Sequence, residues 1–148
     1  MSLEPTAATP EPALPPDTGT EPDPSPAAAA MPASSIGAGV TMLRDTLMPV
    51  GNVSDPWGEY QKSIASSHEI FAANPDRLVM IKSAADILAA KRDKKFGVLL
   101  GTQDTCMIGG DLDRVAAMRK EGVLTLQLTY NNGNRCGDGA LETRDSGL

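Results

Sequence analysis

Hydrophobic and polar side chains follow two different periods along residues 36–148, and segments of the two kinds alternate along the chain. Short apolar runs bounded by polar residues or glycine are typical of strands, and they lie at 39–43, 78–81, 96–100 and 123–129. Helical signals occupy the segments between them, at 55–73, 84–92 and 112–120. Strands that alternate with helices predict a mainly parallel sheet covered by helices.

Polar residues mark the ends of the three predicted helices. Asp55 followed by proline is typical of a helix start, and Ser83 with Asp86 three positions later predicts a second capped start. Asp111 predicts the start of the third helix. Gly122 predicts its end, because glycine readily adopts the left-handed conformation that closes a helix.

The last strand, helix and strand form a predicted βαβ unit, whose two strands are expected to be parallel neighbours. In such units ligands bind at the carboxyl ends of the strands. Here those ends are the loops at 101–105 and 129–134, which are rich in amides and hydroxyls. Such side chains also stabilise turns by bonding to nearby backbone, so spacing alone leaves a structural role and a binding role open.

Four segments near the end of the chain carry longer motifs. They are GTQDT at 101–105, GGDLDRV at 109–115, EGVLTLQLTYNNGNRCGDGALE at 121–142 and DSGL at 145–148. Together they resemble the membrane (renal) dipeptidase family of zinc metallopeptidases, especially its bacterial branch, and a weaker match extends back to about Gly37. The resemblance implies an α/β fold, a partial (β/α)8 TIM barrel of about four parallel strands with covering helices. A complete barrel takes about 250 residues, whereas the chain has 148.

The resemblance also implies roles for individual residues. Family members hydrolyse dipeptides with two zinc ions that share a bridging carboxylate. Gln103 stands where the family usually has the bridging glutamate, and Tyr130 stands where it has a substrate-facing histidine. A neutral glutamine is a poor bridge between cations, whereas a tyrosine hydroxyl can polarise a carbonyl without acting as a histidine-like base. Asn131 and Asn134 match the bacterial branch and are expected to shape the loop around substrate or metal.

The sequence supplies few metal ligands. The family's His-x-Asp metal pair has no counterpart, and His68 is the single histidine. A lone histidine in the middle of a helix is more often a packed or rim residue than a ligand. Cys106 and Cys136 lack the spacing of zinc ligands and are predicted to be free thiols. We therefore expect two zinc ions in the full family domain but no metal bound by this chain alone.

Composition divides the chain into two parts. Residues 1–35 hold nine of the 12 prolines and five acidic residues but no Lys or Arg, which predicts a disordered Pro/Ala-rich tail before a partial barrel domain at 36–148. The domain carries 14 acidic and 13 basic residues, so it lacks the excess of positive charge that is typical of nucleic-acid binding. The sequence has neither an apolar run of transmembrane length nor a secretory signal, so we expect a cytoplasmic location.

Two hypotheses from different classes remain. In the first, the chain is a portion of a dipeptidase-family metallohydrolase that acts on a dipeptide-like small substrate, and it is incomplete and inactive by itself. In the second, it is a non-catalytic binding or interaction protein on a half-barrel scaffold. Exposed strand edges of such a scaffold would favour a homo-oligomer.

Overall fold

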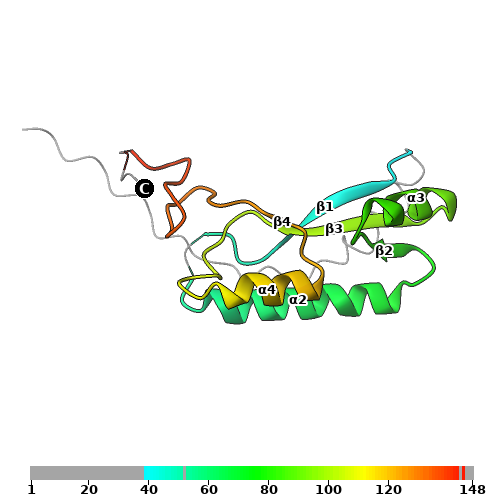
Figure 1. Ribbon diagram of the computed structural model, residues 1–148, viewed down its shortest axis with the longest axis horizontal. Coiled ribbons are helices and arrows are strands. Elements are labelled where there is room, and N and C mark those ends of the chain that lie inside the picture. Colours follow the sequence, from blue (N-terminus) through cyan, green and yellow to red (C-terminus); the bar gives the residue numbers. More distant parts are fainter. Residues whose placement is uncertain (1–38, 52, 144, 146–148) are drawn as a thin grey trace, which may run out of the picture.

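The computed structural model describes residues 39–51, 53–143 and 145, and the predicted tail at 1–35 lies outside them. Strands and helices alternate along the described part, as the sequence predicts. The elements are β1 (Met42–Leu47), α2 (Pro56–Ala73), β2 (Leu78–Met80), α3 (Ala84–Arg92), β3 (Phe96–Thr102), α4 (Asp113–Glu121) and β4 (Thr125–Leu126). Helices α2 and α4 lie side by side along one face of the sheet, and α3 lies at the end where β3 begins (Figure 1).

Strand β3 is the centre of the sheet, and all of its partners run parallel to it. β1 pairs along one edge, from Met42 beside Gly97 to Leu47 beside Thr102. β2 pairs with the first half of β3 and β4 with its last two residues, so these two short strands share the other edge. The prediction that the strands of the last βαβ unit are parallel neighbours is therefore confirmed.

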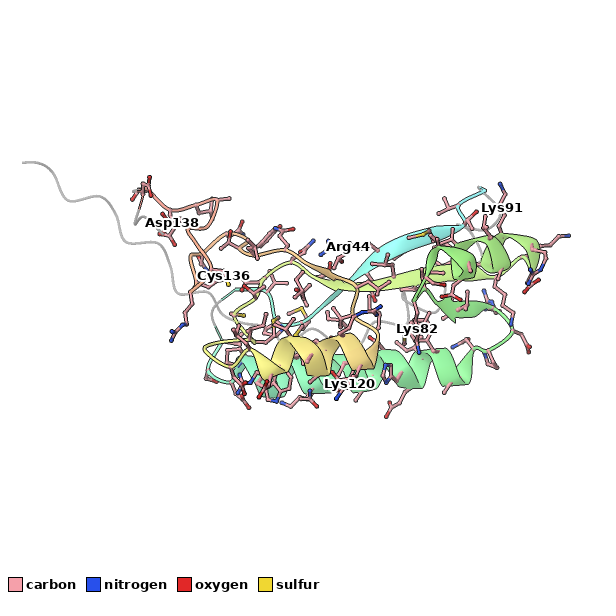
Figure 2. The ribbon with its side chains drawn as sticks, in the orientation of Figure 1. Arg44, Lys82, Lys91, Lys120, Cys136 and Asp138 are labelled. Atoms are coloured by element: carbon pink, nitrogen blue, oxygen red, sulfur yellow. The ribbon has the colours of Figure 1, made fainter. Side chains whose placement is uncertain are left out.

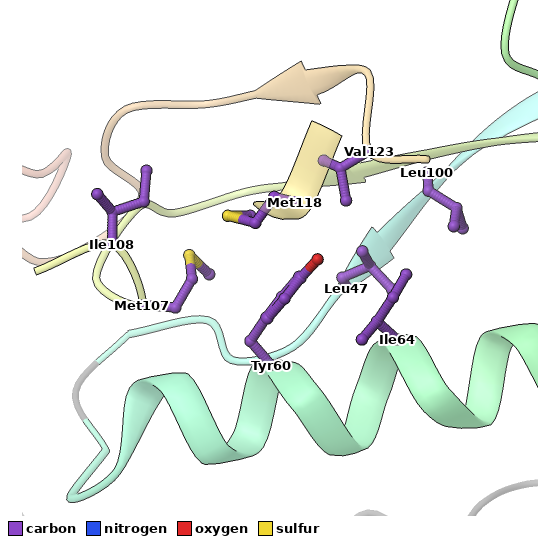
Figure 3. Close-up of a cluster of buried hydrophobic side chains, with 8 residues drawn as sticks. All are labelled: Leu47, Tyr60, Ile64, Leu100, Met107, Ile108, Met118 and Val123. Atoms are coloured by element: carbon purple, nitrogen blue, oxygen red, sulfur yellow. The ribbon is translucent and has the colours of Figure 1, made fainter. Parts of the chain in front are cut away.

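The main hydrophobic core fills the space between the sheet and helices α2 and α4 (Figure 3). Strands, helices and loops all contribute buried side chains, which are Leu47, Tyr60, Ile64, Leu100, Met107, Ile108, Met118 and Val123. Alternation along β3 places Leu100 in this core and Leu99 on the other face of the sheet. Leu99 is only half-buried. One face of the sheet is thus well packed and the other is more open.

Three sequence predictions about element ends are wrong. The first strand was predicted at 39–43, but β1 continues through Arg44 and Asp45 to Leu47. The predicted strand at 123–129 is reduced to the two residues of β4. β2 already pairs with the first residues of β3, so β4 can pair only with the end of β3. Asp111 is not the N-cap of α4. That position is Leu112, and the Asp111 carboxylate instead accepts a bond from the Asp113 backbone N–H at 3.0 Å.

The other predicted helix ends are confirmed. The Asp55 carboxylate accepts from the Gly58 backbone N–H at 3.0 Å, and the Ser83 hydroxyl accepts from the Asp86 backbone N–H at 3.4 Å. Gly122 closes α4 with a φ of +105°, a conformation that glycine adopts without strain. Apart from the start of α4, these helix ends therefore lie where the sequence predicts them.

Glu121, the last residue of α4, joins this helix to α2. The buried Tyr60 hydroxyl donates to Glu121 Oε2 at 2.6 Å, and His68 Nε2 lies 2.9 Å from the Glu121 carbonyl oxygen. His68 is exposed, so it is a rim residue of α2. Burial, together with the neighbouring Glu121 carboxylate, raises the pKa of Tyr60 well above its usual range.

We expect Tyr60→Phe to lower the free energy of unfolding by about 1 kcal/mol at neutral pH, through loss of the bond to Glu121. Because the folded-state pKa of Tyr60 is raised, the tyrosine's contribution is complete below the unfolded-state value of about 10 and declines above it. The difference between the two proteins should therefore shrink in urea unfolding measured above about pH 10. The exposed Tyr130 provides the control, since Tyr130→Phe should leave the free energy of unfolding unchanged at both pH values. A Tyr60→Phe deficit that stays constant across this range would contradict the expectation.

Candidate functional site

The loops that follow β3 and β4 meet at one end of the sheet, because the two strands are parallel and adjacent. The first loop contains Gln103, Asp104 and Thr105, and the second runs from Tyr130 to Asn134. Backbone bonds fold the second loop back on itself, with the Tyr130 carbonyl accepting from Ala140 N–H at 2.7 Å. Polar groups of two separate segments are thereby brought to one place.

Asn134 is the residue that ties these two loops together. Its Nδ2 donates to Asp104 Oδ1 at 3.0 Å and to the Leu128 carbonyl at 2.7 Å, and it lies 3.3 Å from Thr105 Oγ1. Its Oδ1 accepts from the Cys136 backbone N–H at 2.7 Å. Both ends of the amide are used, so the orientation of the side chain is fixed by its partners.

Asp104 is the most buried carboxylate in this region, with an exposed fraction of 1%. Its Oδ1 accepts from the Cys106 backbone N–H at 2.6 Å and from the Asn134 amide, and these donors offset the cost of burying the charge. Thr105 Oγ1 donates to the Leu128 carbonyl at 2.6 Å, which adds a second link between the loops. Asp104 and Thr105 were not predicted as site residues. The available signal was a carboxylate two residues after the end of β3.

The predicted site residues do not form one cluster. Asn134 contacts Asp104 and Thr105, as described above. Gln103 is half-buried just after β3, whereas Asn131 and Tyr130 are exposed, Tyr130 by 38%. Within the described residues no hydrogen bond joins the side chains of these three to one another. The structure therefore places them around one end of the sheet, with Asn134 alone in the network that holds the loops.

Both cysteines are free thiols, as predicted. Cys106 is half-buried, and its Sγ donates to the Gly51 carbonyl at 3.4 Å. Burial, assisted by the neighbouring Asp104 carboxylate, raises the pKa of Cys106 to about 11. Since the thiolate is the reactive form, Cys106 is a poor nucleophile at neutral pH.

We expect iodoacetamide to label the exposed Cys136 of the folded chain at pH 8 well before Cys106, with at least a tenfold difference in rate. Tryptic mass mapping at successive times would measure the two rates. In urea both thiols become exposed, so the rates should converge. Equal rates in the folded chain would show that Cys106 is not protected as described.

The described residues do not fit a zinc centre. Among residues 39–51, 53–143 and 145, no group of three or more His, Cys, Asp or Glu side chains could hold a metal ion. A catalytic zinc usually takes about three protein ligands. Gln103 offers only a neutral amide at the position that the resemblance implies for the bridging carboxylate.

No helix in the described part of the chain is both long and apolar enough to cross a bilayer.

Comparison with known proteins gives a family and a fold. The family model described as "Membrane dipeptidase (Peptidase family M19)" matches residues 52–148. The crystal structure of an amidohydrolase from Pseudomonas aeruginosa is similar to this chain, with a TM-score of 0.73 and 27% sequence identity. The match covers 81% of this chain and 35% of that one, so this chain spans about a third of its length. None of the curated proteins matches the chain. The predicted fold class, an α/β part of a TIM-like barrel, is confirmed.

Proposed function

The chain belongs to the membrane dipeptidase family, peptidase family M19, and we propose that it is one portion of an enzyme that hydrolyses dipeptides. The observation that carries this proposal is the family match over residues 52–148, which includes the βαβ unit and both loops of the candidate site. Members of this family are generally zinc-dependent and act on small peptides. In a whole enzyme of this family, bound zinc would supply an activated water for the hydrolysis.

Two observations support the proposal that this portion is inactive by itself. The chain spans about a third of the similar amidohydrolase structure. The described residues do not fit a zinc centre. The metal ions and their ligands would therefore belong to other parts of the enzyme, and this chain would contribute the loops that border the substrate.

The residues of these loops have distinct parts in the proposal. Asn134 positions the loops, because its amide joins Asp104, Thr105 and the backbone after β4. Tyr130 is exposed beside them, and its hydroxyl would donate a hydrogen bond to the substrate carbonyl. Gln103 and Asn131 would form the neutral polar wall of the site. Each of these side chains can bind or orient a peptide through hydrogen bonds while remaining uncharged itself.

Two measurements test the proposal. The purified chain, supplied with zinc and a panel of dipeptides, should show no turnover above the metal alone. Clear zinc-dependent hydrolysis by the chain would contradict its incompleteness. In native cell extract, an antibody against a peptide within 98–134 should detect a species more than twice the calculated 15.4 kDa. A species near that mass would favour the second candidate below.

The second candidate function is a non-catalytic binding or oligomeric interaction protein on a half-barrel scaffold. Gln103 and Tyr130 favour it, because both are neutral where the resemblance implies ionisable groups. The more open face of the sheet and the outer edge of β1 would then be covered by another molecule. Light scattering after size-exclusion chromatography should show one discrete oligomer. A heterogeneous aggregate would count against this candidate.

A further inference from the structure

Basic side chains gather at the end of the sheet where β2 and β3 begin, which is opposite the end that carries the candidate site. Two backbone bonds bring their segments together. The Phe96 N–H donates to the Arg77 carbonyl at 2.8 Å, and the Lys95 N–H donates to the Ala90 carbonyl at 2.9 Å. We call this set the basic end, and its members are Arg77, Lys91, Arg92, Lys94 and Lys95.

The charge of the basic end is only partly balanced by neighbouring carboxylates. The same segments contain two acidic residues, Asp76 and Asp93, against five basic ones, an excess of three positive charges. Asp93 Oδ1 lies 2.8 Å from Arg92 Nε. The hydrogen bond from Arg92 and, more weakly, the charge of Lys95 lower the pKa of the Asp93 carboxyl. The local field therefore favours negative charge.

Three cations of the basic end have no carboxylate partner within the described part of the chain. They are Arg77, Lys91 and Lys94, and all three are exposed. The dipole of α3 accounts for a cation in its last turn, such as Lys91. It does not account for Arg77 or Lys94, which lie outside the helix. The basic end is thus able to take up further negative charge.

The chain enters the fold at this same end. The described part begins at Gly39, and the Thr41 carbonyl accepts from the Gly97 N–H at 2.8 Å. Gly97 is only two residues after Lys95. In Figure 2, Lys91 lies next to the start of β1. The segment that precedes Gly39 is therefore joined to the fold beside the basic end.

That segment carries charge of the opposite sign. Residues 1–35 hold no Lys or Arg and five carboxylates, at Glu4, Glu11, Asp17, Glu21 and Asp23. Asp23, the nearest, is 16 residues before Gly39. A chain of that length can span up to about 55 Å, about five times the width of a helix. All five carboxylates can therefore reach the cations of the basic end.

We propose that residues 1–35 dock on the basic end of their own chain through these carboxylates. An exposed ion pair contributes only about 0.2 to 1 kcal/mol. Attachment beside the basic end compensates for this weakness, because it holds the carboxylates at an effective concentration of about millimolar. The docked segment would shield Arg77, Lys91 and Lys94 from other anions. It would leave the candidate site open, and the proposal does not depend on dipeptide hydrolysis.

Zero-length cross-linking of the 148-residue chain tests the contact. A carbodiimide activates a carboxylate, and a touching lysine amine then displaces the activating group as a urea and forms an amide. Trypsin leaves the tail in one peptide, because Arg44 is the first basic residue. We expect links from this peptide to Lys91 and Lys94 to exceed those to Lys120, an exposed lysine of α4, about fivefold at low salt. Equal yields at the three lysines would overturn the proposal.

Salt separates docking from simple proximity to the attachment point. Raising the ionic strength from about 0.1 M to about 1 M shortens the screening length from about 10 Å to about 3 Å. The preference for Lys91 and Lys94 should then fall by at least half, whereas a preference that is unchanged would overturn the proposal. A mixture of ¹⁴N and ¹⁵N chains should give links within one isotope only. A statistical share of mixed-isotope links would show docking on a second copy, which would also overturn it.

A variant that removes a charge but no amine identifies the attraction itself. Arg77→Gln should lower the links to Lys91 and Lys94 about twofold, in keeping with one exposed ion pair. Arg119→Gln, at an exposed arginine of α4, should leave them unchanged. Equal effects of the two variants would contradict a role for the basic end. Circular dichroism would identify a variant that fails to fold, and the salt series on the wild-type chain then decides by itself.

Discussion

Replacing Leu100 by alanine is expected to lower the free energy of unfolding by about 3 to 5 kcal/mol. Leu100 is fully buried in the centre of β3 and belongs to the cluster that joins the sheet to α2 and α4. The substitution removes three carbon atoms and leaves a cavity that packed neighbours fill only in part. Since domains of this size are stable by about 5 to 15 kcal/mol, the loss is a large share of the total. Urea unfolding followed by the fluorescence of Trp57, the single tryptophan, would measure it.

Leu99→Ala is the matched control. It makes the same chemical change one residue earlier, on the half-buried face of the same strand. We expect it to cost less than about half as much in this chain, because less apolar surface is lost from the interior. Equal losses would contradict the assignment of the packed face to α2 and α4. In a longer protein that closes the barrel, the same control should become more costly, because further strands would then bury Leu99.

The sequence could predict the helices because most of their ends carry local start or stop signals. Asp55, Ser83 and Gly122 act through bonds within a few residues, so a local pattern is sufficient to identify them. The parallel βαβ unit at 96–129 was predictable for a similar reason, since its short connections leave few topologies.

Strand ends were harder to predict because they depend on distant partners. Arg44 and Asp45 resemble a loop in sequence, yet pairing with Leu99 and Leu100 keeps both in β1. No local signal shows that a glycine in β3 and a threonine in β4 give the Arg44 side chain a place to bind. The length of β4 depends in the same way on how far β3 extends beyond β2.

The candidate site shows the same limit. Asn134 was found through a motif, but its function in the fold depends on Asp104, which lies 30 residues away in the sequence. The burial of Asp104 depends on how the two loops close over it, and spacing along the chain does not contain this information. Similarity to known proteins identifies the family, whereas only the contacts of Asn134 show that it links the two loops.

Asn134→Asp is expected to lower the free energy of unfolding by at least about 3 kcal/mol at pH 7. The wild-type amide donates to Asp104 Oδ1 at 3.0 Å, whereas a carboxylate in its place would set two negative charges at that distance around a buried group. The bonds to the Leu128 carbonyl and Thr105 Oγ1 would also lose their donor. Asn131→Asp, in the same loop but exposed, should change stability by less than about 0.5 kcal/mol.

The dependence on pH separates charge repulsion from the loss of hydrogen bonds. The nearby Asp104 charge should raise the folded-state pKa of the carboxyl introduced at position 134 above the unfolded value of about 4. Its penalty is therefore complete above the raised folded pKa and disappears as the pH falls towards the unfolded value. The deficit of Asn134→Asp against wild type should shrink between pH 7 and about pH 4. That of Asn134→Ala, which loses the same donor without adding a charge, should shrink less. Urea unfolding of the three proteins at both pH values measures these differences in the free energy of unfolding. If the deficits of the two variants shrink equally as the pH falls, repulsion from Asp104 is not the cause.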